Sequence, residues 1–195
     1  PANTLVLHPS VSNRAVKNCY WDINFEPDYT KTEKQWESEI DETLSESVKM
    51  RLISDVPLGV FLSGGMDSST IVALMDKYST EPIKTFSIGF KEKKYNELEY
   101  AKAVAKQYNT DHHEMIVEPG SIELLEKLIT IYDEPFADSS AIPTYYLSKF
   151  VKEHVTVVLS GDGGDELFAG YDSYTKMVKL HNRFLNYPTF NNLTW

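Results

Sequence analysis

Two short glycine-rich segments carry the residue types best suited to chemistry. The first, residues 63–69, reads Ser-Gly-Gly-Met-Asp-Ser-Ser and follows a short apolar run. Glycines let a backbone turn tightly and approach a ligand, and the N–H groups that open a helix can bind an anion together with serine hydroxyls. Asp67 lies inside this cradle, where a carboxylate would repel a phosphate unless a cation such as Mg²⁺ lies between them. The segment therefore predicts a site for a phosphate and a metal ion.

The alternative for this segment is a tight turn in which Asp67 or Ser68 only caps the following helix. The full seven residues, placed between a strand and a helix, favour the phosphate site. The segment is not a Walker A loop, because it lacks the lysine, and it does not match the G-x-G-x-x-G pattern of dinucleotide folds.

The second segment, residues 159–171, reads Leu-Ser-Gly-Asp-Gly-Gly-Asp-Glu-Leu-Phe-Ala-Gly-Tyr and brings three acids within five residues. Its spacing does not fit an EF-hand loop, which has acids at alternating positions before a glycine. A solvated acidic turn is the usual explanation for such a cluster. This cluster follows a buried strand in a sheet that already carries a phosphate loop, and that position favours a functional role.

Strands and helices alternate from residue 56 onward, after an amphipathic helix that begins near Trp36. This order predicts an α/β fold, a parallel twisted sheet with helices on both faces. In such a sheet, ligands bind beyond the carboxyl ends of the strands, where both glycine-rich segments are expected. The strands are expected at 56–62, 83–90, 112–117 and 155–159, and the helices at 67–78, 96–108, 121–132 and 141–151.

The N-terminal residues 1–26 differ from the rest and predict a short β arm with strands at 4–8 and 18–21. This arm is either the remnant of an upstream domain or a hairpin packed on the main domain. Residues 27–35 read as a linker, in which Thr32 and Gln35 fit a capping box, and 36–195 as the main domain. The pattern is lost toward residues 191–195, so we expect the chain to stop inside a domain.

Composition narrows the class of protein. Nineteen Lys and Arg residues stand against 29 Asp and Glu in 195 residues, a net charge of −10, which argues against nucleic-acid binding. No stretch approaches the roughly 20 apolar residues of a membrane span, and the first residues given do not have the pattern of a signal peptide, a basic region followed by an apolar run. Cys19 is the only cysteine. We read it as structural and expect a cytoplasmic protein, because reducing compartments are the usual home of chains without disulfides.

The first segment resembles the PP-loop of ATP pyrophosphatases, which cleave ATP between its α- and β-phosphates. Together with 85–90, 133–140 and the second segment, in this order, it resembles the synthetase domain of glutamine-dependent asparagine synthetase. The resemblance runs from about Trp36 to Tyr174 and implies a PP-loop (adenine nucleotide alpha hydrolase-like) fold. Residues 1–26 would then be the end of that enzyme's glutaminase domain.

The resemblance implies an ATP-dependent ligase with ATP and Mg²⁺ as cofactors. In that family the β-carboxylate of aspartate attacks the α-phosphorus of ATP, giving β-aspartyl-AMP and pyrophosphate. Ammonia released from glutamine by the upstream glutaminase domain then displaces AMP, giving asparagine. The family also has a catalytic lysine on a helix beyond the second segment, so we expect this chain by itself to lack full activity. The oligomeric state stays open, with a homodimer as one option.

The resemblance also implies site residues. Asp67 and Asp165 would bind Mg²⁺. Asp162 is the candidate catalytic residue for the ammonia step, although it stands where many members carry the longer Glu. The candidates for the aspartate pocket are Asp138, Ser139 and Ser140. The residues that would hold ATP are Phe61, Leu62, Ser63, Gly64, Gly65, Asp67, Ser68, Ser69, Ile88, Ser160 and Gly161.

Two other functions stay open from the sequence. A related amidotransferase would adenylate a different carboxylate, as β-lactam-forming or sugar-modifying relatives do. A non-catalytic nucleotide-binding relative would keep the fold without turnover. Asp67 and Asp165 argue against the second option, because a protein without turnover has no need of metal ligands.

Overall fold

The computed structural model describes residues 2–8, 14–91, 96–117 and 122–185. The chain divides into two compact units, Pro1–Asp41 and Glu42–Trp195, and helix α1 (Glu33–Arg51) crosses from the first into the second. Residues 191–195, where the sequence pattern is lost, lie outside the described part. Among the described helices, none combines the length and the apolar character needed to cross a bilayer.

The first unit contains an antiparallel hairpin and the start of α1. Strands β1 (Asn3–His8) and β2 (Arg14–Cys19) pair along their whole length, so the second strand begins and ends earlier than expected. The predicted capping box is present. The Thr32 N–H donates to Oε1 of Gln35 at 2.8 Å, and the Gln35 N–H donates to Oγ1 of Thr32 at 3.4 Å.

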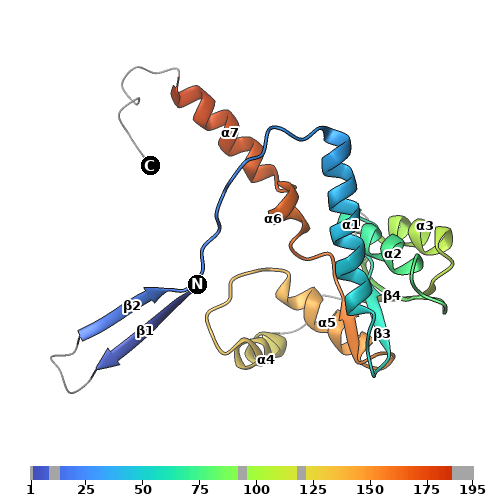
Figure 1. Ribbon diagram of the computed structural model, residues 1–195. Coiled ribbons are helices and arrows are strands. Elements are labelled where there is room, and N and C mark those ends of the chain that lie inside the picture. The colour runs from blue at the N-terminus through green and yellow to red at the C-terminus, as the bar shows by residue number, and fades with distance from the viewer. Residues whose placement is uncertain (1, 9–13, 92–95, 118–121, 186–195) are drawn as a thin grey trace. The chain divides into compact units, whose positions relative to one another are not determined.

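The second unit is built on a four-stranded parallel sheet with the strand order β5-β4-β3-β6. Two of its strands, β3 and β4, are labelled in Figure 1. Helices alternate with these strands, which confirms the predicted α/β fold class. The strands are β3 (Leu58–Phe61), β4 (Lys84–Phe90), β5 (Asp111–Val117) and β6 (Val157–Leu159). The helices are α2 (Met66–Asp76), α3 (Leu98–Gln107), α4 (Ile122–Tyr132), α5 (Ala141–Val151), α6 (Gly164–Phe168) and α7 (Asp172–Leu185).

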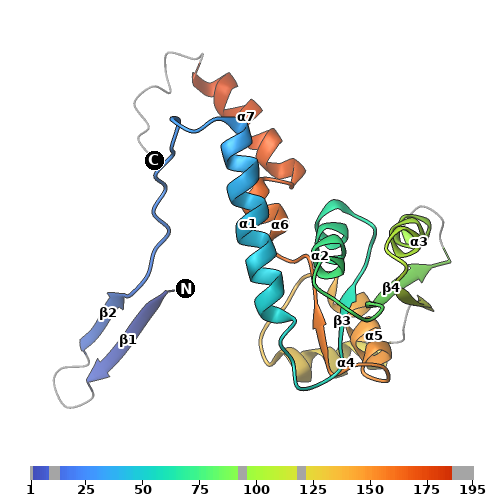
Figure 2. The ribbon, with the colours of Figure 1, turned by 45° about the vertical axis from the view of Figure 1, so that its right-hand side comes forward.

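Both faces of the sheet are packed against helices, whose paths can be followed in Figure 2. On one face, Val60 packs with Val72 of α2 and Ala101 of α3. On the other face, Phe86 packs with Val151 of α5 and Val155, just after it. Successive strand side chains point to opposite faces, so strands buried on both sides read as continuous apolar runs. This explains why β3, whose central residues are buried, was recognisable as part of an apolar run.

The adjacent residues His112 and His113 point to opposite faces of the sheet, as the period of a strand requires. Nδ1 of His112 lies 2.7 Å from Oγ1 of Thr85, and its Nε2 lies 3.1 Å from Oε1 of Glu114. Burial lowers the pKa of His112 below its usual value, and the neighbouring Glu114 opposes that shift. The ring of His113 instead stacks on Phe86, with the centroids 5.3 Å apart.

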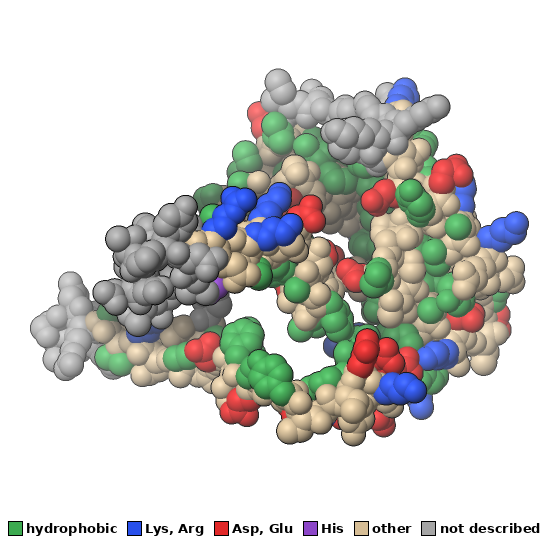
Figure 3. Space-filling model, turned by 90° about the horizontal axis from the view of Figure 1, so that it is seen from above, with side chains coloured by type: hydrophobic (Ala, Val, Ile, Leu, Met, Phe, Trp, Pro, Cys, Tyr) green, Lys and Arg blue, Asp and Glu red, His purple; other side chains and the backbone are tan. Residues whose placement is uncertain are grey.

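Strand β3 lies between β4 and β6, and this order places the predicted site. Val60 pairs with Leu159 near the ends of β3 and β6, so the loops that follow these two strands leave the sheet side by side. On the face drawn in Figure 3, acidic and basic side chains of the described residues are interspersed, without a broad basic patch.

Candidate active site

A pocket of about 430 Å³ lies where the loops after β3 and β6 meet. Both glycine-rich segments contribute to its wall, as expected for the carboxyl ends of parallel strands. The structure thus brings together residues from two segments far apart in the sequence. The lining residues are Phe61, Ser63, Asp67, Ser68, Ser160, Gly161, Asp162, Gly163, Asp165, Glu166 and Tyr171.

Serine hydroxyls shape the loop after β3. Oγ of Ser68 accepts the Ser63 N–H at 3.2 Å and lies 3.0 Å from Oγ of Ser63, which accepts the Gly65 N–H at 3.2 Å. Gly64 has a φ of +82°, and a Cβ there would lie 2.5 Å from the backbone nitrogen of Ala101 in α3. Only glycine combines this conformation with so close an approach.

The loop leads directly into α2, whose first-turn N–H groups have no acceptor within the helix. They carry the positive end of the helix dipole, so they can bind a phosphate oxygen. Oγ of Ser69, in this first turn, is buried and has no hydrogen-bond partner among the described residues. The turn therefore offers backbone donors to an anion, and the hydroxyl-bearing residues Ser63 and Ser68 line the pocket beside it.

The two loops interlock around Asp67. A Cβ on Gly161 would lie 2.9 Å from Cβ of Asp67 and 2.9 Å from the backbone nitrogen of Ser68. A Cβ on Gly164 would lie 2.6 Å from Oδ2 of Asp67. Both glycines are thus needed for the β6 loop to approach this carboxylate, and the backbone of one loop fixes the position of an acid on the other.

The four acids of the pocket differ in their partners. Asp67 and Asp165 accept no side-chain hydrogen bond from the described residues, whereas Oδ2 of Asp162 accepts the Ser160 hydroxyl at 2.9 Å. The described residues contain no cluster of three or more His, Cys, Asp or Glu side chains arranged to hold a metal. Asp67 and Asp165 can supply two carboxylates, and a Mg²⁺ ion here would take further oxygens from a phosphate ligand and water.

The fourth acid is Glu166. The Tyr171 hydroxyl donates a hydrogen bond to Oε1 of Glu166, with the two oxygens 2.7 Å apart. This bond lowers the pKa of Glu166 and raises the pKa of Tyr171 to about 12. The turn after α6 makes the contact geometrically feasible. Ala169 ends the helix with a φ of +55°, and the Gly170 N–H donates to the Asp165 carbonyl at 2.9 Å, so the chain folds back over α6.

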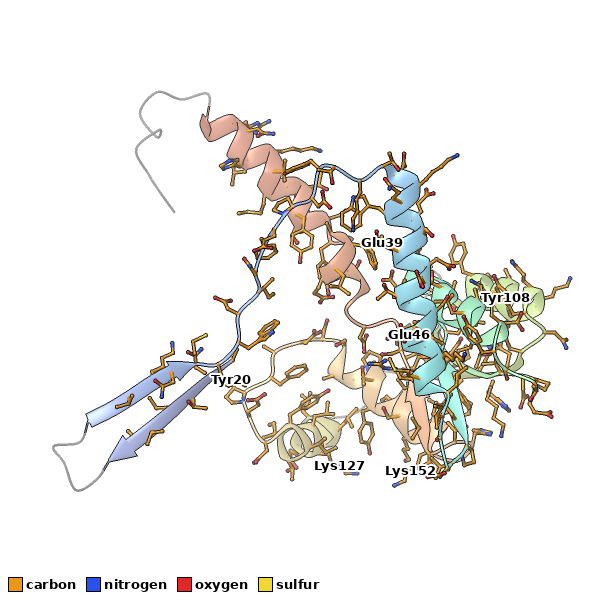
Figure 4. All side chains as sticks on the ribbon, viewed as in Figure 1. Tyr20, Glu39, Glu46, Tyr108, Lys127 and Lys152 are labelled. Atoms are coloured by element: carbon orange, nitrogen blue, oxygen red, sulfur yellow. The ribbon has the colours of Figure 1, made fainter. Side chains whose placement is uncertain are left out.

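No lysine or arginine is among the described residues that line this pocket. Lys127 of α4 and Lys152, just after α5, are labelled in Figure 4, and neither contributes to the wall. The positive potential that an anionic ligand needs must therefore come from the start of α2 and from a bound cation.

A second pocket of about 240 Å³ shares Phe61 and Ser63 with the first. Its wall includes Leu62 and Ile88, two of the residues predicted to hold ATP. The Ser87 hydroxyl donates to the Leu62 carbonyl and so fixes the two strand ends to each other. The complete lining is Phe61, Leu62, Ser63, Phe86, Ser87, Ile88, Phe90, Glu97, Leu98, Ala101, Pro143 and Leu147.

Some predicted residues lie outside these two pockets. Gly64, Gly65 and Ser69 belong to the first loop and its helix without lining either pocket. Asp138 and Ser139 line a separate, largely apolar pocket of about 850 Å³ beside α4. The Ser140 N–H donates to Oδ1 of Asp138 at 2.8 Å, which lowers the pKa of Asp138. The structure does not bring the predicted aspartate-pocket residues to Asp67 and Asp165.

Sequence reasoning assigned no site role to Gly163, Glu166 and Tyr171 in the first pocket, nor to most of the residues that line the second, Glu97 among them. Glu166 and Tyr171 lie five residues apart inside the second segment. Helix α6 and the turn that follows it bring their side chains together. Their position in a segment already predicted to line the site could have marked them as site residues. Glu97 follows a different strand, and nothing in its local sequence indicated a pocket.

Comparison with known proteins places the chain in a family. A family model described as Asparagine synthase matches residues 39–195. A Methanocaldococcus jannaschii protein provisionally named asparagine synthetase (glutamine-hydrolyzing) 2 is 47% identical over 167 residues, covering 84% of this chain and 32% of that protein. Asparagine synthetase (glutamine-hydrolyzing) 1 of Bacillus subtilis is 39% identical over 162 residues, covering 83% and 25%. The chain thus spans about a quarter to a third of the length of these curated relatives.

A solved structure is also similar. An NH3-dependent NAD synthetase from Campylobacter jejuni matches with a TM-score of 0.45 and 19% sequence identity, covering 69% of this chain and 60% of that one. The family model covers well over half of the chain and includes both loops of the pocket. The chain therefore belongs to the asparagine synthase family.

Proposed function

We propose that this chain carries the ATP site of an asparagine-forming ligase. The observation that carries the proposal is the pair of carboxylates, Asp67 and Asp165, which lack side-chain hydrogen bonds from described residues and line one pocket with the start of α2. Family membership supports ATP-dependent chemistry at this pocket. The whole enzyme would comprise further parts, with residues 1–26 as the end of an upstream glutaminase domain and 27–35 as the linker.

ATP would lie across both pockets. Its phosphates would occupy the first pocket, on the N–H groups of α2 and the hydroxyls of Ser63 and Ser68. Its base would enter the apolar second pocket beside Leu62 and Ile88. The shared residue Phe61 would lie between the two, near the sugar. This placement uses the nucleotide-binding residues predicted from the sequence and needs no rearrangement of the sheet.

The reaction would begin with attack of the β-carboxylate oxygen of aspartate on the α-phosphorus of ATP. The new P–O bond forms as the bond to the bridging oxygen of the β-phosphate breaks, and pyrophosphate leaves with that electron pair. Ammonia would then attack the acyl carbon of β-aspartyl-AMP, lose a proton and expel AMP, giving asparagine. The residues on the two loops would position ATP and exclude water from the acyl adenylate.

The carboxylates of Asp67 and Asp165 fit a magnesium site, since they have no hydrogen-bond partners among the described side chains and the first is cradled by Gly164. Mg²⁺ bound there would neutralise charge on the phosphates during the transfer. Asp162 would assist the ammonia step. Its carboxylate already accepts the Ser160 hydroxyl, which orients it at the pocket wall.

The first test is titration of the chain with Mg·ATP by calorimetry, comparing wild type with Asp67→Asn. Asp76→Asn is the matched control, because it makes the same charge change at the other end of α2. We expect saturable, magnesium-dependent binding by the wild type and the control and a loss of at least tenfold in Asp67→Asn. Equal binding by all three proteins would refute the assignment of the pocket.

The acceptor is tested separately in the full-length enzyme. Aspartate-dependent exchange of labelled pyrophosphate into ATP, followed by formation of asparagine and AMP, is the expected result. Exchange that requires a different carboxylic acid would identify a related amidotransferase. Binding of ATP without any exchange would identify a non-catalytic relative.

A further inference from the structure

The second pocket contains one ionisable side chain among its lining residues, Glu97, in a wall that is otherwise mostly apolar. Glu97 is exposed, so its carboxylate can exchange water for hydrogen bonds from a ligand at this wall. Glu97 lies immediately before α3, on the segment between β4 and that helix. Its position at the rim of a proposed nucleotide pocket therefore raises the question of which ligand group it meets.

The Glu97 carboxylate has no structural task among the described residues. It does not cap α3, because the N–H of Leu98 donates to Oδ1 of Asn96 at 3.2 Å. Only the backbone carbonyl of Glu97 is used, as the acceptor of the Tyr100 N–H at 3.0 Å and the Ala101 N–H at 3.2 Å. Neither carboxylate oxygen accepts a hydrogen bond from a residue that the structure describes, so both can accept one from a ligand.

The other polar side chains of this pocket are committed. The Ser87 hydroxyl donates to the carbonyl of Leu62. Oγ of Ser63 lies 3.0 Å from Oγ of Ser68 and accepts an N–H from its own loop. Glu97 is thus the strongest side-chain acceptor that the described wall offers.

The location of α3 indicates which part of a nucleotide lies near Glu97. The Gly64 loop touches the backbone of α3 at Ala101, one turn after Glu97. The two pockets join at Phe61 and Ser63. A nucleotide with phosphates in the first pocket and its base in the second must place its ribose where they join, on the side of the base pocket nearest the phosphate loop.

We infer that the Glu97 carboxylate accepts hydrogen bonds from the ribose hydroxyls of ATP and makes the site selective for ribonucleotides. A carboxylate is an acceptor only, and the two adjacent hydroxyls of ribose are both donors. Hydrogen bonds to a charged acceptor are stronger than neutral ones, and apolar walls strengthen them further. The inference rests on the proposed function, because it assumes that ATP occupies both pockets.

The test compares the affinities of four nucleotides: Mg·ATP, its 2′-deoxy and 3′-deoxy analogues, and purine riboside triphosphate, which lacks the adenine amino group. Each is titrated into wild type, Glu97→Ala and Glu97→Gln. Glu99→Ala is the matched control, an exposed acid on the same helix that does not line the pocket. Thermal unfolding of each variant confirms that it is folded.

Wild type and Glu99→Ala should bind ATP about tenfold more tightly than at least one deoxy analogue, the effect of one hydrogen bond to a charged group. Glu97→Ala should reduce that ratio to near one, with Glu97→Gln intermediate. An unchanged ratio in Glu97→Ala would overturn the inference. So would a loss of discrimination against purine riboside triphosphate instead, since the carboxylate would then contact the base.

Two further outcomes separate this inference from the proposed function. A folded wild type that binds no Mg·ATP would refute both. A wild type that binds Mg·ATP and both deoxy analogues equally would refute the role of Glu97 alone.

Discussion

Replacing Gly164 by alanine should damage the proposed metal site while leaving the fold intact. A Cβ at this position would lie 2.5 Å from Cγ, 2.6 Å from Oδ2 and 2.8 Å from Oδ1 of Asp67, all below ordinary van der Waals contact. These atoms form the free end of a side chain, which can rotate away. The new methyl group therefore displaces the carboxylate rather than the backbone.

The size of the displacement follows from the contact distances. Ordinary contact begins at 3.4 Å, so Oδ2 must move by about 0.8 Å from its present place. Metal–ligand distances tolerate only about 0.2 Å, and a misplacement of about 1 Å can reduce a rate about 100-fold. We expect Mg·ATP affinity to fall at least tenfold. The free energy of unfolding should change by less than about 1 kcal/mol, because alanine also favours the first turn of α6.

Calorimetry with Mg·ATP measures the loss of affinity, and urea unfolding measures the stability. Affinity equal to that of the wild type would refute the reasoning, because either Asp67 does not hold the metal or the pocket does not hold the nucleotide. A double-mutant cycle sharpens the result. In an Asp67→Asn background, Gly164→Ala should cost little further affinity, since both changes remove the same ligand.

Gly161→Ala provides the contrasting case, since its Cβ would meet the backbone nitrogen of Ser68 at 2.9 Å. Backbone at the start of α2 cannot rotate away, so this variant should lose about 1–3 kcal/mol of stability as well as affinity. If Gly161→Ala and Gly164→Ala lost the same stability, the added methyl groups would be pushing the two loops apart. The Asp67 side chain would then not be selectively displaced.

Three further predictions concern the Gly64 turn, the buried His112 and the hydrogen bond between Tyr171 and Glu166. Gly64→Ala should lower the free energy of unfolding by about 3 kcal/mol in urea titration, because alanine meets both a left-handed φ and the backbone of α3. Stability should fall as pH drops below about 6.5, where unfolded His112 binds a proton that burial denies to the native state. Unfolding curves of His112→Gln between pH 7.5 and 5 should show a smaller decline, and an identical decline would contradict the assignment. Tyr171→Phe should return the pKa of Glu166 toward 4.5, and carboxyl NMR titration that detects no rise would show that the hydroxyl does not hold it.

The centre of the sheet could be predicted because β3 and β4 are buried on both faces. Residues 83–90 and 141–151 are apolar runs of the right length for a strand and a helix, and the structure places β4 and α5 there. The N-terminal hairpin was harder to delimit. The strand Arg14–Cys19 is exposed and contains polar residues, so the sequence lacks the burial pattern that marks a strand.

The pocket could be predicted in outline because both loops follow strands of one parallel sheet. The contacts within it could not. Neither Glu97 nor the Tyr171–Glu166 hydrogen bond has a periodic signal, since each depends on how a loop folds back. The role of Gly164 could not be predicted either. A Cβ at this position would collide with the carboxylate of Asp67, which lies almost a hundred positions earlier in the sequence.

The acidic side chains of the first pocket determine how much positive potential the backbone and a cation must supply. Four carboxylates line it, and no lysine or arginine does so among the described residues, yet the proposed ligand is a triphosphate. Asp162 accepts a hydrogen bond from the Ser160 hydroxyl, and Glu166 accepts one from the Tyr171 hydroxyl. Asp67 and Asp165 are therefore the acids available to a cation. A bound cation and the N–H groups of α2 must then outweigh the repulsion of these acids. Under the proposed function, the close approach of the β6 loop to Asp67 would hold a cation between these acids and the phosphates of the ligand.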